Sequence, residues 1–127
     1  MQRTSTATAC LTGGRKRASI SGLDRAHVVA AVHTEGGLRI AAKLRPGEVD
    51  CVELRVDALA DRLDLVRRTA SGLRVPILLT VRHPAEGGVG GLSARRRREL
   101  LMEFLPIATL VDVELCSSES MRGVSAS

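Results

Sequence analysis

Apolar and polar residues alternate along residues 50–57, whose sequence is DCVELRVD. A period of two is typical of a β-strand, because successive side chains point to opposite faces. One predicted face carries the aliphatic residues Val52, Leu54 and Val56. The opposite face carries the charged residues Glu53, Arg55 and Asp57. Burying such a row is costly unless the charges pair with one another or meet a ligand. The stretch is therefore a predicted strand and the first candidate for a site.

The same patterning predicts an alternation of strands and helices across residues 27–116. The strands are expected at residues 27–33, 50–56, 75–82 and 110–115. Apolar stripes at intervals of three and four predict helices at residues 35–44, 59–70 and 93–105, the last with Ser93 as its N-cap. With about 25 to 33 residues per repeat, this order indicates right-handed βαβ crossovers and a parallel sheet.

Polar residues recur on one face of the later strands as well. Aliphatic residues occupy one face of each strand, whereas the other face carries Thr80, Arg82, Asp112 and Glu114. An open, flavodoxin-like sheet has helices on both faces and would bury this row. A (β/α) barrel instead directs its inner face towards a site at the C-terminal ends of the strands. The pattern therefore favours an α/β fold of the TIM-barrel class.

Composition limits the chain to one modest domain. It has 127 residues, 44% of them hydrophobic, and its single aromatic residue is Phe104, so the core is expected to be aliphatic. The three cysteines are odd in number and widely spaced, which suits neither a zinc site nor a disulfide framework and indicates a reducing cytosol. No apolar run approaches the roughly 20 residues of a transmembrane helix.

The formal net charge of +5 is concentrated near the start of the chain. Residues 1–26 hold five basic residues and one acidic residue, a balance of +4, so the other 101 residues carry about +1. Residues 1–26 lack apolar periodicity and are expected to form a disordered basic extension, and residues 117–127 a frayed end. The arginine run at residues 95–98 is expected to be a solvated helix face. This distribution disfavours a nucleic-acid-binding domain.

The polar face suggests recognition of a small, hydroxyl-rich, anionic molecule. Carboxylates accept hydrogen bonds from hydroxyls, and arginine holds a carboxylate through a bidentate fork. Glu86 opens a glycine-rich stretch, EGGVGG, and closure of a mobile lid would bring it to such a ligand. The alternative is an internal salt-bridge network of Glu53, Arg55, Asp57 and Arg82 with no ligand. Spacing alone leaves both interpretations open.

Three motifs in this order and spacing resemble type I 3-dehydroquinate dehydratase: VELRVDALAD at 52–61, PILLTVRHPAEGG at 76–88 and VDVEL at 111–115. The resemblance covers roughly residues 28–116. It implies a (β/α)8 barrel, of which residues 27–116 form about the first four βα units, a half barrel. It also implies a cytoplasmic enzyme of the shikimate pathway to chorismate and the aromatic amino acids. Such enzymes are usually homodimers and use neither a metal nor a dissociable cofactor.

The resemblance also implies roles for individual residues. Glu53 and Arg82 would contact the hydroxyl side of 3-dehydroquinate, and Glu86 would lie beside the catalytic pair. The supporting groups would be Arg55, Asp57, Asp112 and Glu114. The reaction is the dehydration of 3-dehydroquinate to 3-dehydroshikimate. In the family a lysine forms an imine with the ketone, and a histidine then removes the neighbouring proton and helps water to leave.

The sequence departs from the family at that catalytic pair. Of its two lysines, Lys16 lies in the extension and Lys43 on a helix, and its three histidines (His27, His33 and His83) precede the family's position. Both catalytic groups are therefore expected outside this chain, which alone is expected to be inactive. The interpretations left open are a truncated enzyme, a subunit of a split enzyme, a non-catalytic fragment and, from another class, a basic nucleic-acid-binding module.

Overall fold

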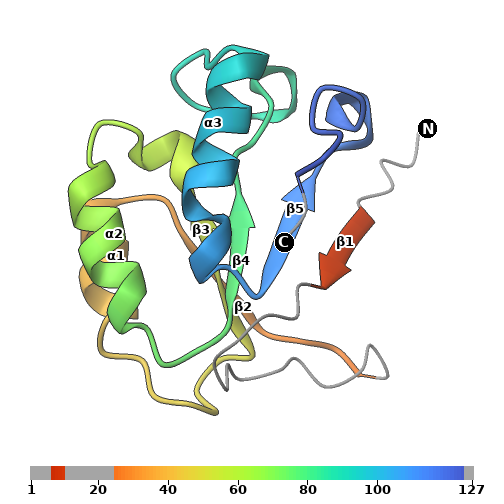
Figure 1. The fold of residues 1–127 in the computed structure, drawn as a ribbon. Helices are drawn as coiled ribbons and strands as arrows, with labels where there is room; N and C mark the ends of the chain where they lie inside the picture. The colour runs from red at the N-terminus through yellow and green to blue at the C-terminus, as the bar shows by residue number, and fades with distance from the viewer. Residues whose placement is uncertain (1–6, 11–24, 125–127) are drawn as a thin grey trace.

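A computed structural model describes residues 25–124 and the backbone of residues 7–10 (Figure 1). The strands are β1 (Ala7–Cys10), β2 (Val29–Val32), β3 (Cys51–Arg55), β4 (Ile77–Thr80) and β5 (Leu110–Val113). The α-helices are α1 (Glu35–Ala41), α2 (Leu63–Gly72) and α3 (Ala94–Phe104). Short 3₁₀ helices are η1 (Val56–Leu59), η2 (Pro84–Glu86), η3 (Leu105–Ile107) and η4 (Leu115–Ser117).

The five strands form one sheet in the order β1-β5-β4-β3-β2. β2, β3, β4 and β5 are parallel, and each pairs with the next strand in the chain. A flavodoxin-like sheet changes direction after its first strand, so its order would not follow the chain. Successive parallel strands joined through helices are the arrangement of consecutive units of a (β/α) barrel. The predicted fold class, a partial TIM barrel, is confirmed.

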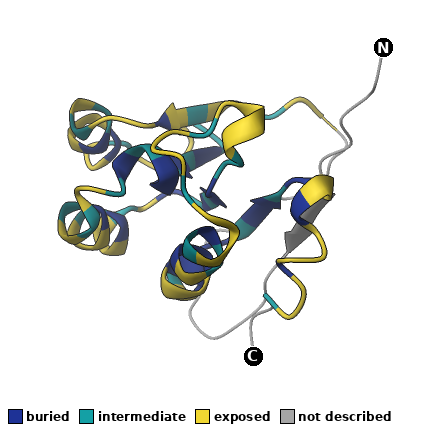
Figure 2. Ribbon diagram, turned by 90° about the horizontal axis from the view of Figure 1, so that it is seen from above, coloured by how far each residue is buried: buried dark blue, intermediate teal, exposed yellow. Residues whose placement is uncertain are grey.

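The core lies between the aliphatic face of the sheet and the helices (Figure 2). Val52, Leu54 and Leu79 are completely buried on the strands, as are Leu38 of α1 and Val66 of α2. The alternation predicted for residues 50–57 is therefore confirmed over β3, but Val56 and Asp57 do not continue the strand as predicted, because the chain turns into η1 after Arg55. Because these side chains occupy one face, the polar side chains of the same strands must lie on the other.

The helix boundaries follow local signals. The Ser93 hydroxyl accepts a hydrogen bond from the Arg96 amide at 3.1 Å, which confirms the predicted N-cap of α3. The helix predicted at residues 59–70 begins only at Leu63, as α2, and Leu59 is the last residue of η1. Arg62, with φ −128° and ψ 29°, lies between them, and its backbone is not helical.

The first 26 residues are not wholly unstructured as predicted. Residues 7–10 form β1, which pairs antiparallel with β5, Ala7 opposite Val113 and Cys10 opposite Leu110. The backbone N–H and C=O groups of an edge strand are free to hydrogen-bond with another strand. This pairing depends on residues distant in the sequence, so the pattern of four residues does not predict it. Arg25 forms an ion pair with Asp50, and this hydrogen bond, helped by the Val28 amide, lowers the pKa of Asp50 to about 2. Residues 1–6 and 11–24 lie outside the described residues.

The C-terminal segment also differs from the frayed end predicted from residue 117. Met121 is buried in the core, and Arg98 Nη1 donates hydrogen bonds to the carbonyls of Ser120 and Arg122 at 3.3 and 2.7 Å. Leu115 was expected on the aliphatic face but is 55% exposed, because the chain turns into η4 directly after Glu114. Residues 125–127 lie outside the described part.

The arginine run is solvated only in part. Arg95 and Arg96 pair with Glu99 at 3.0 and 3.2 Å, and these hydrogen bonds lower the pKa of Glu99. Arg97, by contrast, is buried, and its Nη1 donates to the Leu92 carbonyl at 2.9 Å. The predicted solvated face is therefore wrong at Arg97, because α3 turns this position towards the body of the protein.

Candidate active site at the strand ends

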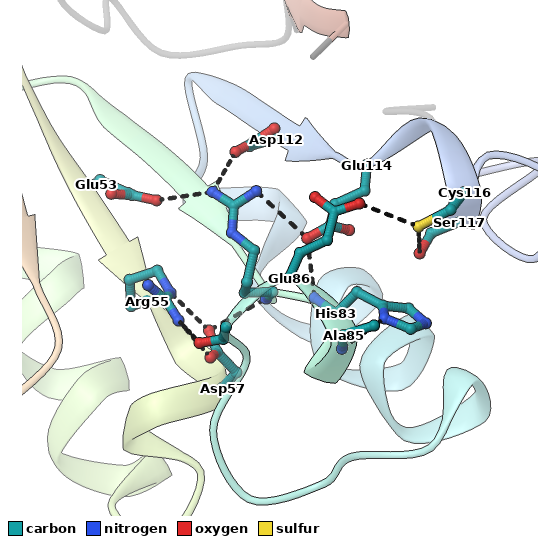
Figure 3. Close-up of polar contacts among 12 residues, drawn as sticks. Glu53, Arg55, Asp57, His83, Ala85, Glu86, Asp112, Glu114, Cys116 and Ser117 are labelled. Carbon is teal, nitrogen blue, oxygen red and sulfur yellow. Dashed lines mark hydrogen bonds and ion pairs between the residues drawn. The ribbon is translucent and has the colours of Figure 1, made fainter. Parts of the chain in front are cut away.

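Four polar side chains from three strands meet at the C-terminal ends of β3, β4 and β5 (Figure 3). Arg82 lies two residues beyond β4, and its Nη2 is 2.8 Å from Asp112 Oδ2 and 3.6 Å from Glu53 Oε1. Its Nη1 is 3.4 Å from Glu114 Oε1. We call Glu53, Arg82, Asp112 and Glu114 the strand-end cluster. The parallel register brings together residues that are far apart in the sequence.

Negative charge exceeds positive charge in the strand-end cluster. Asp112 and Glu114 are buried, and Glu53 and Arg82 are partly exposed. Burial raises the pKa of Asp112; Arg82 opposes this rise, whereas Glu114 and Glu53 add to it. With three carboxylates around one guanidinium, Arg82 is not free to hold the carboxylate of a ligand. The surplus carboxylate oxygens are instead suited to accept hydrogen bonds from hydroxyl groups.

Arg55 and Asp57 form a second unit beside this cluster (Figure 3). Arg55 binds Asp57 through two parallel hydrogen bonds, Nε to Oδ1 at 3.0 Å and Nη2 to Oδ2 at 2.8 Å. Asp57 also accepts hydrogen bonds from the backbone amides of Arg82 and Val89, at 3.2 and 3.0 Å. Burial disfavours the charged form of Asp57, but these hydrogen bonds outweigh it and lower its pKa. The predicted internal ion pairs are thus present.

Residues 83–91, the glycine-rich loop, fold back on themselves after β4. The His83 imidazole caps η2 by accepting from the Ala85 amide at 3.0 Å, and the His83 carbonyl accepts from the amides of Glu86 and Gly88. A side chain at Gly88 would place its Cβ 2.2 Å from the Arg82 carbonyl oxygen, so the chain passes over itself here. The loop is therefore a tight turn in which His83 caps η2, and its closure over a ligand stays a prediction.

Glu86 lies on the exposed surface of this loop, at the rim of the site. Its Oε1 accepts a hydrogen bond from Cys116 Sγ at 3.4 Å (Figure 3). Cys116 is a residue that the sequence analysis did not place in the site. Its position directly after the VDVEL strand, where strand ends converge, was the signal that could have identified it.

Two buried polar atoms near the strand-end cluster have no hydrogen-bond partner. They are Thr80 Oγ1 and Asp112 Oδ1, in residues directly opposite each other on β4 and β5. An unsatisfied buried polar group costs about 1–3 kcal/mol.

Lys43, the lysine among the described residues, does not join this site. Lys43 is exposed just after α1. A helix that joins two parallel strands runs antiparallel to them. Its C-terminal end therefore lies beside the N-terminal ends of the strands, away from the site. Lys43 is therefore not placed to attack a molecule held by Arg82. His33 is exposed beyond β2.

Within the described residues, no group of three or more histidine, cysteine, aspartate or glutamate side chains is arranged to hold a metal ion. Nor does that part of the chain contain a helix long and apolar enough to cross a membrane.

Consecutive parallel βα units with polar residues at the strand ends define this chain as a partial (β/α) barrel. Comparison of its sequence with known protein families then identifies the family. The sequence model of type I 3-dehydroquinase matches residues 27–126, and the chain belongs to this family.

Curated relatives are consistent with that assignment. The chain is 32% identical over 77 residues to a 3-dehydroquinate dehydratase of Methanothrix thermoacetophila, a match covering 61% of the chain and 34% of the relative. It is 34% identical over 80 residues to the enzyme of the same name in Methanothermobacter thermautotrophicus, covering 61% and 36%. The chain thus spans about a third of the length of these relatives. No solved structure matches it significantly.

Proposed function

We propose that this chain provides the substrate-recognition part of a 3-dehydroquinate dehydratase, which converts 3-dehydroquinate to 3-dehydroshikimate and water in the shikimate pathway. Glu53 and Arg82 contact the ring hydroxyls, and Glu86 lies beside the reacting carbons. The observation that carries this proposal is the arrangement of three carboxylates around Arg82.

That arrangement sets the orientation of the substrate. 3-Dehydroquinate has two neighbouring ring hydroxyls away from the carbon that carries its third hydroxyl and its carboxylate, and the surplus negative charge of the strand-end cluster repels that carboxylate. The two neighbouring hydroxyls donate to the partly exposed Glu53, while Arg82 keeps Asp112 and Glu114 in place. The hydroxyl side therefore faces the strand-end cluster, and the carboxylate points away from it.

The imine chemistry comes from groups outside the described residues. A lysine forms the imine with the substrate ketone, which acidifies the neighbouring C–H bond, and a histidine transfers the proton. Lys43 is not the imine-forming lysine, because it lies near the N-terminal ends of the strands and the site lies at their C-terminal ends. On the family resemblance, we further propose that the complete enzyme is a cytoplasmic homodimer that needs neither metal nor dissociable cofactor.

Binding of 3-dehydroquinate to the purified chain tests the recognition step, followed by backbone amide shifts in the NMR spectrum. We expect saturable shifts at the C-terminal ends of β3, β4 and β5. Arg82→Met should weaken binding by roughly 10- to 100-fold, from the loss of charged hydrogen bonds. The exposed control Arg95→Met should leave it unchanged. Equal weakening by both variants, or no saturable shifts, would contradict the proposed recognition.

Catalysis is tested by mixing the chain with a polypeptide that holds the remaining two-thirds of an archaeal relative. The mixture should form 3-dehydroshikimate, and the chain alone should not. Borohydride reduction in the presence of substrate should trap a covalent adduct on the added polypeptide and none at Lys43. Product formation by the chain alone would overturn the assignment of the imine lysine to another region.

A further inference from the structure

The Asp57 carboxylate binds both ends of the turn that carries Glu86. Its Oδ1 accepts from the Arg82 amide, where the turn begins, and its Oδ2 accepts from the Val89 amide, where the turn returns. The distances are 3.2 and 3.0 Å. One carboxylate on η1 therefore joins two backbone positions seven residues apart, and Glu86 lies between them.

Arg55 strengthens this attachment in two ways. It holds the Asp57 carboxylate in a fixed orientation through its bidentate pair, and its Nη2 also donates to the Gly87 carbonyl at 3.2 Å. The Asp57 side chain is completely buried, whereas that of Arg55 is 20% exposed. Charged hydrogen bonds in such a shielded place are stronger than exposed ones. The turn is thus fastened at three points to the end of β3.

We propose that Asp57 is the positioning residue that holds Glu86 at the rim of the site, with Arg55 orienting its carboxylate. The inference rests on the proposed function, because it assigns the fixed position of Glu86 to the substrate site. Beyond its ion pair with Arg55, Asp57 acts through the backbone amides of Arg82 and Val89. In this proposal Glu53 and Arg82 contact the substrate directly, whereas Asp57 acts by holding the turn that carries Glu86.

Asp57→Asn tests this attachment in the whole chain. The amide group presents an N–H donor in place of one carboxylate oxygen, so one of the two backbone amides loses its acceptor. We expect hydrogen exchange of the Val89 or Arg82 amide to accelerate roughly tenfold, the equivalent of one charged hydrogen bond. Exchange at Leu79, in the core of β4, serves as the internal reference for global opening. Asp64→Asn, at an exposed carboxylate paired with Arg67, is the matched control.

Cys116 reports on where Glu86 lies, because its thiol contacts the Glu86 carboxylate. At low ionic strength that carboxylate repels an anionic thiol reagent such as dithiobis(nitrobenzoate) from Cys116. Asp57→Asn should therefore speed the anionic reaction at Cys116 about fivefold. The neutral reagent dithiodipyridine should react at an unchanged rate. Peptide mass spectrometry separates Cys116 from the other two cysteines.

A double-mutant cycle with Glu86→Gln distinguishes positioning from general destabilisation. If Asp57 acts through Glu86, Glu86→Gln should give the same acceleration, and Asp57→Asn should add nothing further to it. Independent, additive effects would overturn the proposal. So would equal acceleration with both reagents, accompanied by reaction of the buried Cys51, since that outcome indicates unfolding.

A second variant keeps the test valid if Asp57→Asn does not fold. Arg55→Lys retains the positive charge but loses the planar fork and its reach to Gly87, so we expect smaller changes in the same direction. Unchanged Val89 exchange and unchanged Cys116 kinetics in a folded variant would overturn the proposal. These measurements need no substrate. If 3-dehydroquinate fails to bind while the loop still loosens, the proposed function fails and the attachment by Asp57 stands.

Discussion

The Arg82 guanidinium donates a hydrogen bond of 2.8 Å to the Asp112 carboxylate, whose pKa is raised by burial. This contact joins the ends of β4 and β5, and the same guanidinium pairs with Glu114 of the β5 end and Glu53 of β3. One cation at the end of β4 therefore offsets three acids from β3 and β5, the two strands that flank it. The stability of this end of the sheet depends on it.

Replacement of Arg82 by methionine should destabilise the fold. It leaves the buried carboxylates of Asp112 and Glu114 without their cation, and breaking such a pair costs about 3 kcal/mol or more. Urea denaturation at neutral pH measures the loss. Arg95→Met removes only an exposed pair with Glu99 and should cost less than about 1 kcal/mol. A similar loss in both variants would show that the burial of the acids does not matter.

Asp57 and Asp112 should contribute to the pH dependence of stability with opposite signs. The pKa of Asp57 is lowered on folding, so its stabilisation is present above about pH 4 and is lost as pH falls through the folded value. The pKa of Asp112 is raised, so the folded state holds its proton more tightly. The free energy of unfolding therefore falls as pH rises from about 4 through that raised value.

Urea midpoints of the wild type, Asp57→Asn and Asp112→Asn between about pH 2 and 7 check these signs. Asp57→Asn should remove part of the gain in stability seen as pH rises towards 4. Asp112→Asn should remove part of the loss seen above 4. Slope changes in the same direction for both variants would contradict the opposite effects of burial and hydrogen bonding at the two carboxyls.

Gly88→Ala should be much more damaging than Gly72→Ala. A Cβ at Gly88 would lie 2.2 Å from the Arg82 carbonyl oxygen, a backbone atom that cannot move without opening the turn. We expect a loss of about 3 kcal/mol, typical of severe overpacking. At Gly72, the last residue of α2, no atom lies within 4 Å of the added Cβ, and alanine should stabilise by about 0.5–1 kcal/mol. Thermal unfolding of both variants measures the contrast.

Leu79→Ala and Leu115→Ala separate the two leucines that the strand pattern treated alike. Leu79 is completely buried on β4, and its truncation should cost about 3 kcal/mol. Leu115 is 55% exposed in η4, and its truncation should change stability by less than about 0.5 kcal/mol. Chemical denaturation gives both values. A large effect at Leu115 would mean that the strand continues past Glu114.

Much of the barrel segment could be predicted because its signals are local. Alternation in DCVELRVD and the apolar stripe that ends at Ala70 report directly which side chains are buried, so the faces of β3 and α2 follow from them. Ser93 marks the start of α3 for the same reason, since a cap acts within one turn. The polar residues at the strand ends could be predicted from the sequence, but the distances between their side chains could not.

Other features depend on partners that are distant in the sequence. The pairing of β1 with β5, the burial of Arg97 and the packing of Met121 each arise where a segment meets a surface formed by another. A pattern of three or four residues contains no information about that surface. The contact between Cys116 and Glu86 likewise exists only because two strand-end loops converge.

The sequence by itself determined that residues 52–55 belong to a strand with aliphatic residues on one face and charges on the other, because that periodicity is local. It could not decide between a substrate site and a network of ion pairs. In the tertiary structure the charged residues form two groups. Arg82 neutralises part of the acidic strand-end cluster, and Asp57 binds the backbone on both sides of Glu86. Only the three-dimensional register of parallel strands decides this, since it sets which charges lie within hydrogen-bonding distance.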